Sequence, residues 1–240
     1  MNKEGKLTLG YFSGGSRFTD DTVMTLAIYK ALKECDRDYQ NLQQLTILNM
    51  KKLGRKYPLV GYGNNFNRWL MLPFAEPYNS YGNGSAMRVS PVAYFANNID
   101  EVKKLSKIVT EITHNHEEGL KGAEAVAVSV WMALYGSTKE EIKEKIEQEY
   151  FNLDFYYKDL VQNYSFDESC QGSVPQAIYA FLISNSFEDT IRTCVEMGGD
   201  ADTMGAIAGA IAGAYYGIPK ELKEKAKEYL TNDLLEILSD

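Results

Sequence analysis

Carboxylates and hydroxyls are concentrated in two short motifs near the two ends of the chain, residues 19–22 (TDDT) and 198–203 (GGDADT). Each motif stands where a helix is expected to begin. Carboxylate and hydroxyl oxygens are the ligands that Mg²⁺ and Mn²⁺ prefer. If the two motifs meet in the fold, they form a two-metal site, which is typical of hydrolytic enzymes. The candidate metal ligands are Thr19, Asp20, Asp21, Asp200, Asp202 and Thr203.

Each motif taken alone also fits a helix N-terminus without any metal. Thr and Asp cap helices there, and acidic residues favour the positive end of the helix dipole. The presence of both motifs in one chain favours metal binding, because the same unusual arrangement would otherwise have to recur for capping alone.

A third motif, residues 81–88 (YGNGSAMR), places two glycines around Asn83 at an expected junction between a loop and a helix. Free backbone N–H groups at such a junction bind anions such as phosphate, although an ordinary junction explains the same residues. Arg88 is expected to pair with a phosphate or with a nearby carboxylate.

Both histidines lie in residues 113–116 (THNH), two positions apart, which is poor spacing for two metal ligands on one helix face. A hydrogen-bonding role at a helix junction is expected for them instead.

Composition narrows the class of protein. The 240 residues suit a single domain spanning 1–240, with residues 1–16 as a mobile or rearranged N-terminal segment. The net charge of −8 argues against a nucleic-acid-binding protein. Three scattered cysteines form no Cys-x-x-Cys pair, so neither zinc nor a disulfide framework is expected. The longest apolar stretch, residues 206–216, is about half of a membrane span, and the N-terminus is polar, so we expect a cytoplasmic protein without membrane contact.

Helical periodicity dominates the chain and predicts an all-α, orthogonal multi-helix bundle. The glycine- and aromatic-rich residues 57–83 are expected to form a long functional loop with a short helix inside it. Gly205, Gly209 and Gly213 recur every four residues, which predicts a central helix in close contact with its neighbours and a central place for residues 200–203. The expected helices are 20–34, 42–53, 66–71, 86–97, 99–113, 118–134, 139–149, 174–184, 187–197, 202–216 and 219–238, the last broken near Thr231.

Five ordered motifs carry a resemblance to a known family: residues 17–24 (RFTDDTVM), 81–91 (YGNGSAMRVSP), 113–114, 173–175 and 198–203 with the Gly/Ala helix that follows. From about residue 17 to residue 219 the chain resembles the ADP-ribosylglycohydrolases, the group that includes dinitrogenase reductase-activating glycohydrolase and the ADP-ribosylhydrolases. The resemblance implies an all-α fold with two Mg²⁺ or Mn²⁺ ions held by the two acidic motifs. It also implies that the 82–85 loop holds the phosphates and ribose of ADP-ribose, that His114 lines the substrate cleft, and that Tyr81 stacks on adenine. The candidate substrate-binding residues are Tyr81, Gly82, Asn83, Gly84, Ser85, Met87 and His114.

The N-terminus departs from the family pattern. Members usually begin with a helix resembling Gly-Ala-x-x-Gly-Asp-x-x-Gly, followed by an acidic residue that reaches the metal site. Residues 1–16 contain neither, and Glu4 is a poor substitute in a polar segment. Loss of a core helix would expose apolar surface, so either a monomer or a homodimer is expected.

Three functions follow from these residues. The leading hypothesis is metal-dependent hydrolysis of an ADP-ribosyl glycosidic bond, releasing ADP-ribose from a modified protein side chain or a small conjugate, with Asp20, Asp21 or Asp202 as the catalytic carboxylate. The second is a catalytically impaired ADP-ribose-binding module, because the N-terminal helix and its acidic ligand are missing. The third is a metal-dependent phosphohydrolase that cleaves the pyrophosphate. The acceptor linkage and the identity of the base are left open.

Overall fold

The computed structural model describes residues 12–13, 15–36, 38–74 and 76–239. Every regular element within these residues is a helix, and an isolated β-bridge joins Gly82 to Ser169. The prediction of an all-α fold is therefore confirmed. The helices are α1 (Asp20–Glu34), α2 (Leu42–Lys56), α3 (Asn64–Met71), α4 (Val92–Phe95), α5 (Ile99–Thr110), α6 (Glu117–Leu134), α7 (Lys139–Glu149), α8 (Tyr157–Asn163), α9 (Cys170–Ile183), α10 (Phe187–Met197), α11 (Ala201–Tyr216), α12 (Lys220–Lys227) and α13 (Asn232–Ser239).

Several helices begin at a side chain that accepts a hydrogen bond from the first turn. Asn98 caps α5, His116 caps α6, Thr138 caps α7 within a capping box, Ser169 caps α9 and Ser186 caps α10. Such caps satisfy backbone donors that have no partner inside the helix. They fix where each helix begins, and the expected bonding role of His116 at a helix junction is confirmed.

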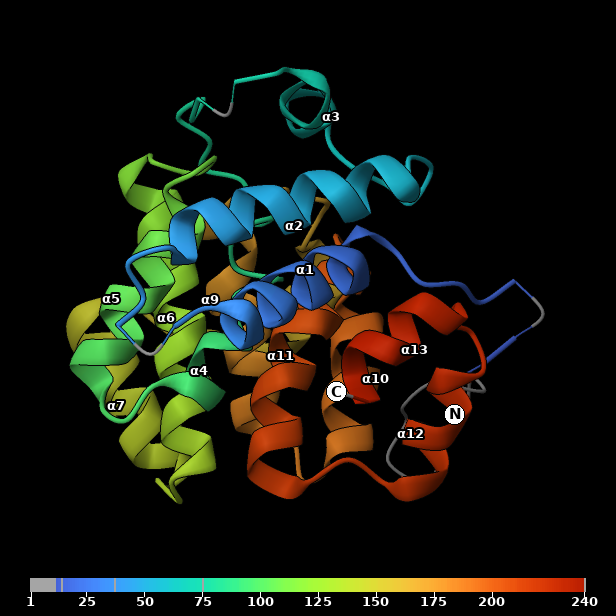
Figure 1. The fold of residues 1–240 in the computed structure, drawn as a ribbon. Coiled ribbons are helices and arrows are strands. Elements are labelled where there is room, and N and C mark those ends of the chain that lie inside the picture. The colour runs from blue at the N-terminus through green and yellow to red at the C-terminus, as the bar shows by residue number, and fades with distance from the viewer. Residues whose placement is uncertain (1–11, 14, 37, 75, 240) are drawn as a thin grey trace.

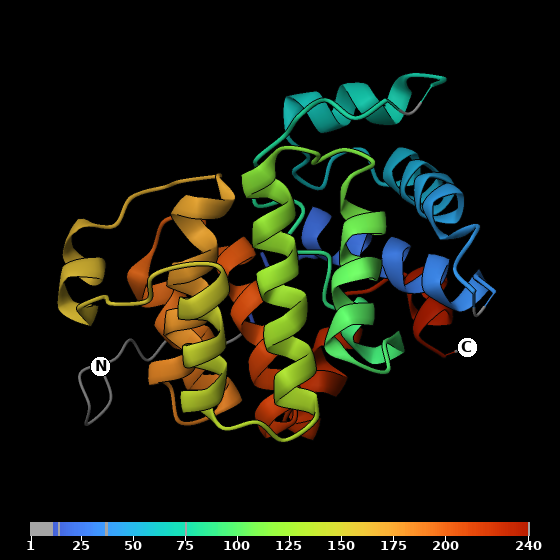
Figure 2. The ribbon, with the colours of Figure 1, turned by 90° about the vertical axis from the view of Figure 1, so that its left-hand side faces the viewer.

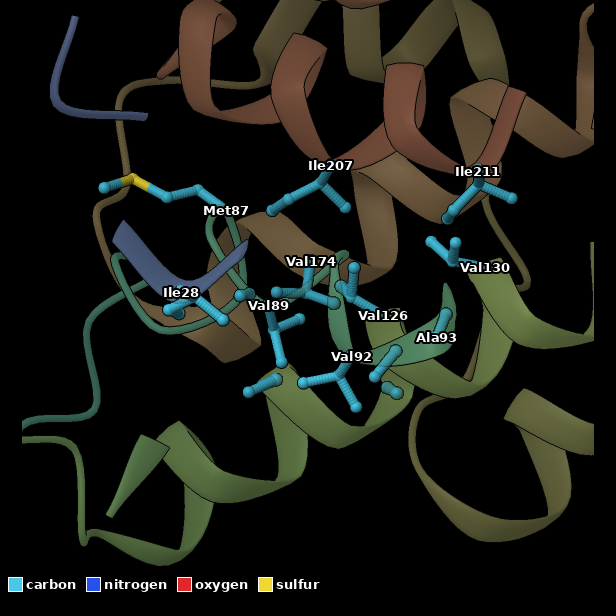
Figure 3. Packing of buried hydrophobic residues seen from close by; sticks show 14 of the residues in the cluster. Ile28, Met87, Val89, Val92, Ala93, Val126, Val130, Val174, Ile207 and Ile211 are labelled. Carbon is cyan, nitrogen blue, oxygen red and sulfur yellow. The ribbon is translucent and has the colours of Figure 1, made fainter. Parts of the chain in front are cut away.

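The apolar core surrounds α11, which packs against α6, α9 and α10. Figure 3 shows Val130 of α6 and Ile211 of α11 pointing toward each other, with Val174 of α9 nearby. The central position predicted for the Gly/Ala helix is thus confirmed. The predicted close contact is only partly present, because a methyl group on Gly209 would lie 2.9 Å from Ile191 Cδ1, whereas one on Gly205 would meet open space.

The first three helices lie in successive layers on this core. Figure 1 shows α1 beside α11, α2 above α1, and α3 outside the bundle above α2, and Figure 2 shows the same outlying position for α3. The C-terminal α13 is bound to the end of α2, because Tyr57 Oη donates to Asp233 Oδ1 at 2.6 Å and Lys56 Nζ lies 2.6 Å from Asp233 Oδ2.

Two sequence predictions about the elements were wrong. Residues 86–91 form tight turns, and only Val92–Phe95 are helical, so the helix expected over 86–97 is mostly absent. The short helix α8 was not predicted, because it spans only seven residues and none of its side chains is buried. Residues 1–11, including Glu4, lie outside the described part of the chain. The ring of Phe12, where the described chain begins, stacks on the ring of Tyr229 with centroids 5.3 Å apart.

Candidate active site

The first acidic motif stands at the start of α1 and does not cap it. Thr19 is in an extended conformation and makes no side-chain bond to the helix backbone. Its hydroxyl instead donates to Asp21 Oδ2 at 2.7 Å. The Asp21 side chain is 6% exposed, and its Oδ1 has no hydrogen-bond partner among the described residues. A buried carboxylate oxygen without a donor is costly unless a ligand satisfies it.

The second acidic motif stands at the start of α11 and also makes no side-chain cap. Gly198 and Gly199 have positive φ angles of 77° and 66°, which a side chain rarely adopts. A methyl group on Gly199 would also lie 2.3 Å from the Tyr164 ring. The turn delivers Asp200 to Asn83, whose Nδ2 donates to Asp200 Oδ2 at 2.7 Å. This bond ties the acidic motif to the glycine loop.

The carboxylates of the two motifs interact with one another. Burial, followed by the charge of Asp21, raises the pKa of Asp20 to about 7, with smaller contributions from Asp202 and Asp200. Burial likewise raises the pKa of Asp21, against the hydrogen bond from Thr19 and together with the charge of Asp202. Burial and hydrogen bonding to Asp202 raise the pKa of Asp200 to about 6, although the bond from Asn83 opposes this. The fold therefore gathers like charges, which is typical of functional sites.

The donor set suits Mg²⁺ or Mn²⁺ in its chemistry. All candidate ligands are carboxylate or hydroxyl oxygens, and the Thr203 hydroxyl is close enough to Asp21 to lower the pKa of that carboxyl. Within the described residues, however, no three His, Cys, Asp or Glu side chains converge closely enough to hold one ion. Oδ1 of Asp21 provides one buried oxygen without a partner. The residues fit a hard divalent cation, provided that their side chains rotate toward it.

The glycine loop presents free backbone donors beside this cluster. The N–H groups of Gly84 and Ser85 have no acceptor among the residues that the structure describes. Their neighbours are engaged, because the Asn83 N–H donates to Glu168 O at 2.7 Å and the Gly82 N–H donates to Ser80 Oγ at 3.2 Å. Two adjacent free N–H groups can bind an anion.

The other predicted substrate residues lie at different depths. Tyr81 is 52% exposed and packs its ring edge against His116, with centroids 5.4 Å apart. Ser85 is fully buried, and its hydroxyl donates to Gly119 O at 2.9 Å. Met87 is also buried and belongs to the apolar core (Figure 3). Only Tyr81 and the glycines are therefore accessible from outside, and His114 lies directly behind them.

Arg88 was expected to meet a phosphate or a carboxylate and meets neither. Its side chain is 1% exposed, and Nη2 donates to Thr113 Oγ1 at 2.6 Å. The guanidinium also lies 5.5 Å from the centre of the Phe66 ring. A conformation that depends on contacts from distant segments cannot be deduced from the local sequence.

The sequence did not predict that Gly61 and Tyr62 lie beside Asp20 of the first acidic motif. A methyl group on Gly61 would lie 2.9 Å from Asp20 Oδ1, and Gly61 has a φ of 116°. Tyr62, which follows it, is buried with no partner for its hydroxyl among the described residues, and burial and the charge of Asp20 raise its pKa. The glycine-rich character of residues 57–83 was a signal for a functional loop but not for these two residues.

An apolar hollow of about 440 Å³ borders the start of α1. Phe18, Phe187, Ile191, Ile218 and Leu222 are among the residues that line it. It offers few hydrogen-bond donors, so we place the candidate site at the carboxylates and the glycine loop. None of the helices in the described part of the chain is sufficiently long and apolar to span a membrane.

The chain is similar in sequence and fold to several known proteins. ADP-ribosylhydrolase ARH3 of Gallus gallus is 29% identical over 83% of this chain and 70% of its own length, and ARH3 of Homo sapiens is 26% identical over 91% and 77%. ADP-ribosylarginine hydrolase Tri1 of Pseudomonas putida is 28% identical over 60% of this chain and 42% of its own. A solved structure described as an ADP-ribosylglycohydrolase-related protein complex superposes with a TM-score of 0.64 at 26% identity, covering 88% of this chain and 78% of that one. Because the family profile also matches residues 3–240, the chain belongs to the ADP-ribosylglycohydrolase family.

Proposed function

We propose that this protein hydrolyses an ADP-ribosyl glycosidic bond and releases ADP-ribose from a modified side chain or a small conjugate. The observation that carries the proposal is that the fold brings the acids of the two motifs together, around a buried Asp21 oxygen that has no donor among the described residues. Neither motif uses its side chains to cap its helix, as is also true of α2, α3, α8 and α12. The acids instead raise one another's pKa values, which favours a site for cations over a purely structural role.

Metal binding is part of this proposal, with Thr19, Asp20, Asp21, Asp200, Asp202 and Thr203 as the residues that would hold Mg²⁺ or Mn²⁺. Such ions neutralise charge and lower the pKa of a bound water toward neutrality. Asp21 Oδ1 supports the assignment, because a buried oxygen without a donor suits a cation.

Asp20 is our candidate for the residue that moves a proton. Burial and the charge of Asp21 raise its pKa to about 7 in the metal-free protein, and a bound cation would keep the carboxylate ionised and able to accept a proton. Its Oδ1 approaches Gly61, where no side chain screens it. A carboxylate in this position would accept a proton from water and also stabilise the positive charge that develops on a ribosyl ring.

The glycine loop is the proposed place for the phosphates of the substrate. The free N–H groups of Gly84 and Ser85 and the exposed ring of Tyr81 support this assignment. Asn83 bonds to Asp200, so a ligand seated on the loop would lie beside the second acidic motif. The acceptor side of the bond is not assigned.

Turnover of defined substrates tests the proposal. The purified protein would be incubated with arginine-linked and serine-linked ADP-ribosyl peptides and with O-acetyl-ADP-ribose, with Mg²⁺ or with a chelator, and the products read by mass spectrometry. Intact ADP-ribose that appears only with Mg²⁺ supports the glycosidic reaction. AMP and ribose phosphate would instead indicate a phosphohydrolase.

A binding module is the second candidate. It is favoured by the absence of three converging ligands within the described residues. It predicts that calorimetry detects ADP-ribose binding while every substrate stays intact. Binding without turnover would therefore replace the first proposal with the second.

A further inference from the structure

The hydrogen bonds behind the glycine loop form a short chain that starts at a group able only to donate. Arg88 Nη2 lies 2.6 Å from Thr113 Oγ1, which in turn lies 2.7 Å from His114 Nδ1. All three side chains are buried. A guanidinium has no acceptor atom, so the Thr113 oxygen must accept from Arg88.

The direction of the second bond follows from the first. Thr113 is 0% exposed, and within the described residues its hydroxyl forms hydrogen bonds with Arg88 and His114 alone. A proton on His114 Nδ1 would leave the Thr113 proton without an acceptor, which is costly for a buried group. It would also face Arg88 Nη2, a donor 3.4 Å away. Both hydrogen bonds of the Thr113 hydroxyl form when His114 Nδ1 accepts from Thr113, which leaves the imidazole proton on Nε2.

The ring stays neutral for a separate reason. Burial, together with the positive charge of Arg88, lowers the pKa of His114 well below its usual 6.5. The other titratable side chain that faces it is Tyr78, with ring centroids 6.1 Å apart, and burial raises the pKa of Tyr78 to about 12. Tyr78 is therefore uncharged and does not offset the positive charge of the guanidinium.

Nε2 faces the two glycines of the loop. A methyl group on Gly84 would lie 3.6 Å from Nε2, and one on Gly82 would lie 3.7 Å from it. No described residue accepts a hydrogen bond from Nε2, although His114 is only 4% exposed. The unused N–H groups of Gly84 and Ser85 belong to the same loop. An incoming acceptor oxygen would thus find the Nε2–H group of His114 and the free N–H groups of Gly84 and Ser85 side by side.

We propose that Arg88 and Thr113 are positioning residues, which hold His114 as a neutral imidazole with its proton on Nε2 so that it donates to a phosphoryl oxygen of the ligand over Gly82 and Gly84. This inference rests on the proposed function for the identity of the ligand, ADP-ribose. The state of the ring in the free protein is independent of that identity.

Long-range ¹H–¹⁵N NMR of the histidine rings tests the inference directly. The chain has two histidines, so His116→Asn, which keeps a residue suited to capping α6, assigns the signals of His114. We expect one neutral tautomer with the proton on Nε2 from about pH 5 to about pH 8. A proton on Nδ1, or a charged ring in that range, would overturn the inference.

Two substitutions of Arg88 separate positioning from simple packing. Arg88→Met removes the donor and the charge, so the Thr113 hydroxyl becomes free to accept from Nδ1. We expect the Nδ1–H tautomer to appear, the pKa of His114 to rise, and ADP-ribose affinity to fall by about fivefold to tenfold. Arg88→Lys keeps a group that only donates, and it should retain the wild-type tautomer and most of the affinity. An unchanged tautomer and affinity in Arg88→Met would contradict the assignment.

The two proposals fail in different ways. If the wild-type protein binds no ADP-ribose in calorimetry, the proposed function is wrong, and so is the ligand named here. If the protein binds ADP-ribose but the spectrum places the proton on Nδ1, the positioning role of Arg88 and Thr113 is wrong and the proposed function stands.

Discussion

At the scale of single residues, the carboxyl groups of the two motifs share one electrostatic environment. Burial and neighbouring charge raise the pKa of Asp20 to about 7 and that of Asp200 to about 6, and they raise the pKa of Asp21 as well. Raised pKa values mean that the folded protein holds protons that the unfolded chain has already released. The same groups would lose those protons to a divalent cation.

The stability of the metal-free protein should therefore decrease as the pH rises. Between the ordinary aspartate pKa of 3.8 and the folded value of about 7 for Asp20, the folded state binds more protons than the unfolded state, so the free energy of unfolding falls. We expect the Tm, measured with a chelator present, to fall from about pH 5 to about pH 8, and Mg²⁺ to restore it at the upper end. A metal-free Tm that rises through this range would contradict the raised pKa values.

Replacement of Asp21 by Asn should separate stability from activity. The change removes a buried negative charge while keeping the shape of the side chain, so the Tm of the metal-free protein should rise at about pH 8. Turnover should fall by about 100-fold or more, because a cation ligand is lost. Asp100→Asn, at an exposed position in the first turn of α5, is the control and should leave turnover unchanged. Thermal unfolding with a chelator present would measure the first effect, and product release with Mg²⁺ would measure the second.

At the scale of elements, the loop 82–85 depends on the absence of side chains. A methyl group on Gly84 would touch His114 Nε2 at 3.6 Å, an ordinary contact distance, so Gly84→Ala should fold normally. The methyl group would nevertheless occupy the space in front of the free N–H groups. We expect ADP-ribose affinity to fall about tenfold with little change in Tm. Unchanged affinity in calorimetry would remove the loop from the proposed site.

Helix α11 provides both a stability prediction and a control for that experiment. A methyl group on Gly205 would meet open space, and interior Ala is favoured over Gly by about 1 kcal/mol. Gly205→Ala should therefore raise the Tm by about 2–4 °C and leave ADP-ribose affinity unchanged. A lower Tm in thermal unfolding would show that α11 does not tolerate a side chain at this position.

The elements also show what the sequence could predict. The bounds of α1, α7 and α10 were predicted to the residue, because regular apolar spacing coincides with capping or turn residues at their ends. Residues 86–91 were wrongly assigned to a helix. This segment crosses the core, so its apolar side chains are buried on all sides (Figure 3). Their spacing therefore reflects burial and does not indicate a helix.

The candidate site was predictable in its residue types but not in its partners. Asp and Thr at two helix starts indicated a cation site, and the paired glycines indicated an anion loop. Arg88 was expected near a ligand but lies behind His114, and Asn83 holds Asp200 at 2.7 Å. Both contacts join segments far apart in the chain, and local patterns contain no information about such pairs.

At the scale of the whole molecule, the bundle brings the N-terminus of α1, the N-terminus of α11 and the glycine loop to one place. The family profile spans residues 3–240, which agrees with a single domain over 1–240, although that division stays a prediction, as does the choice between a monomer and a homodimer. The account requires that these three segments act together as one hydrolytic site.

The most direct test is quantitative release of ADP-ribose from one linkage that the wild-type protein cleaves. Mass spectrometry would compare the wild-type protein with Mg²⁺, the wild-type protein with chelator, Asp21→Asn and Asp100→Asn. The account predicts intact ADP-ribose from the wild-type protein and Asp100→Asn with Mg²⁺, and almost none from the other two samples. Equal release with chelator, or full activity in Asp21→Asn, would contradict it.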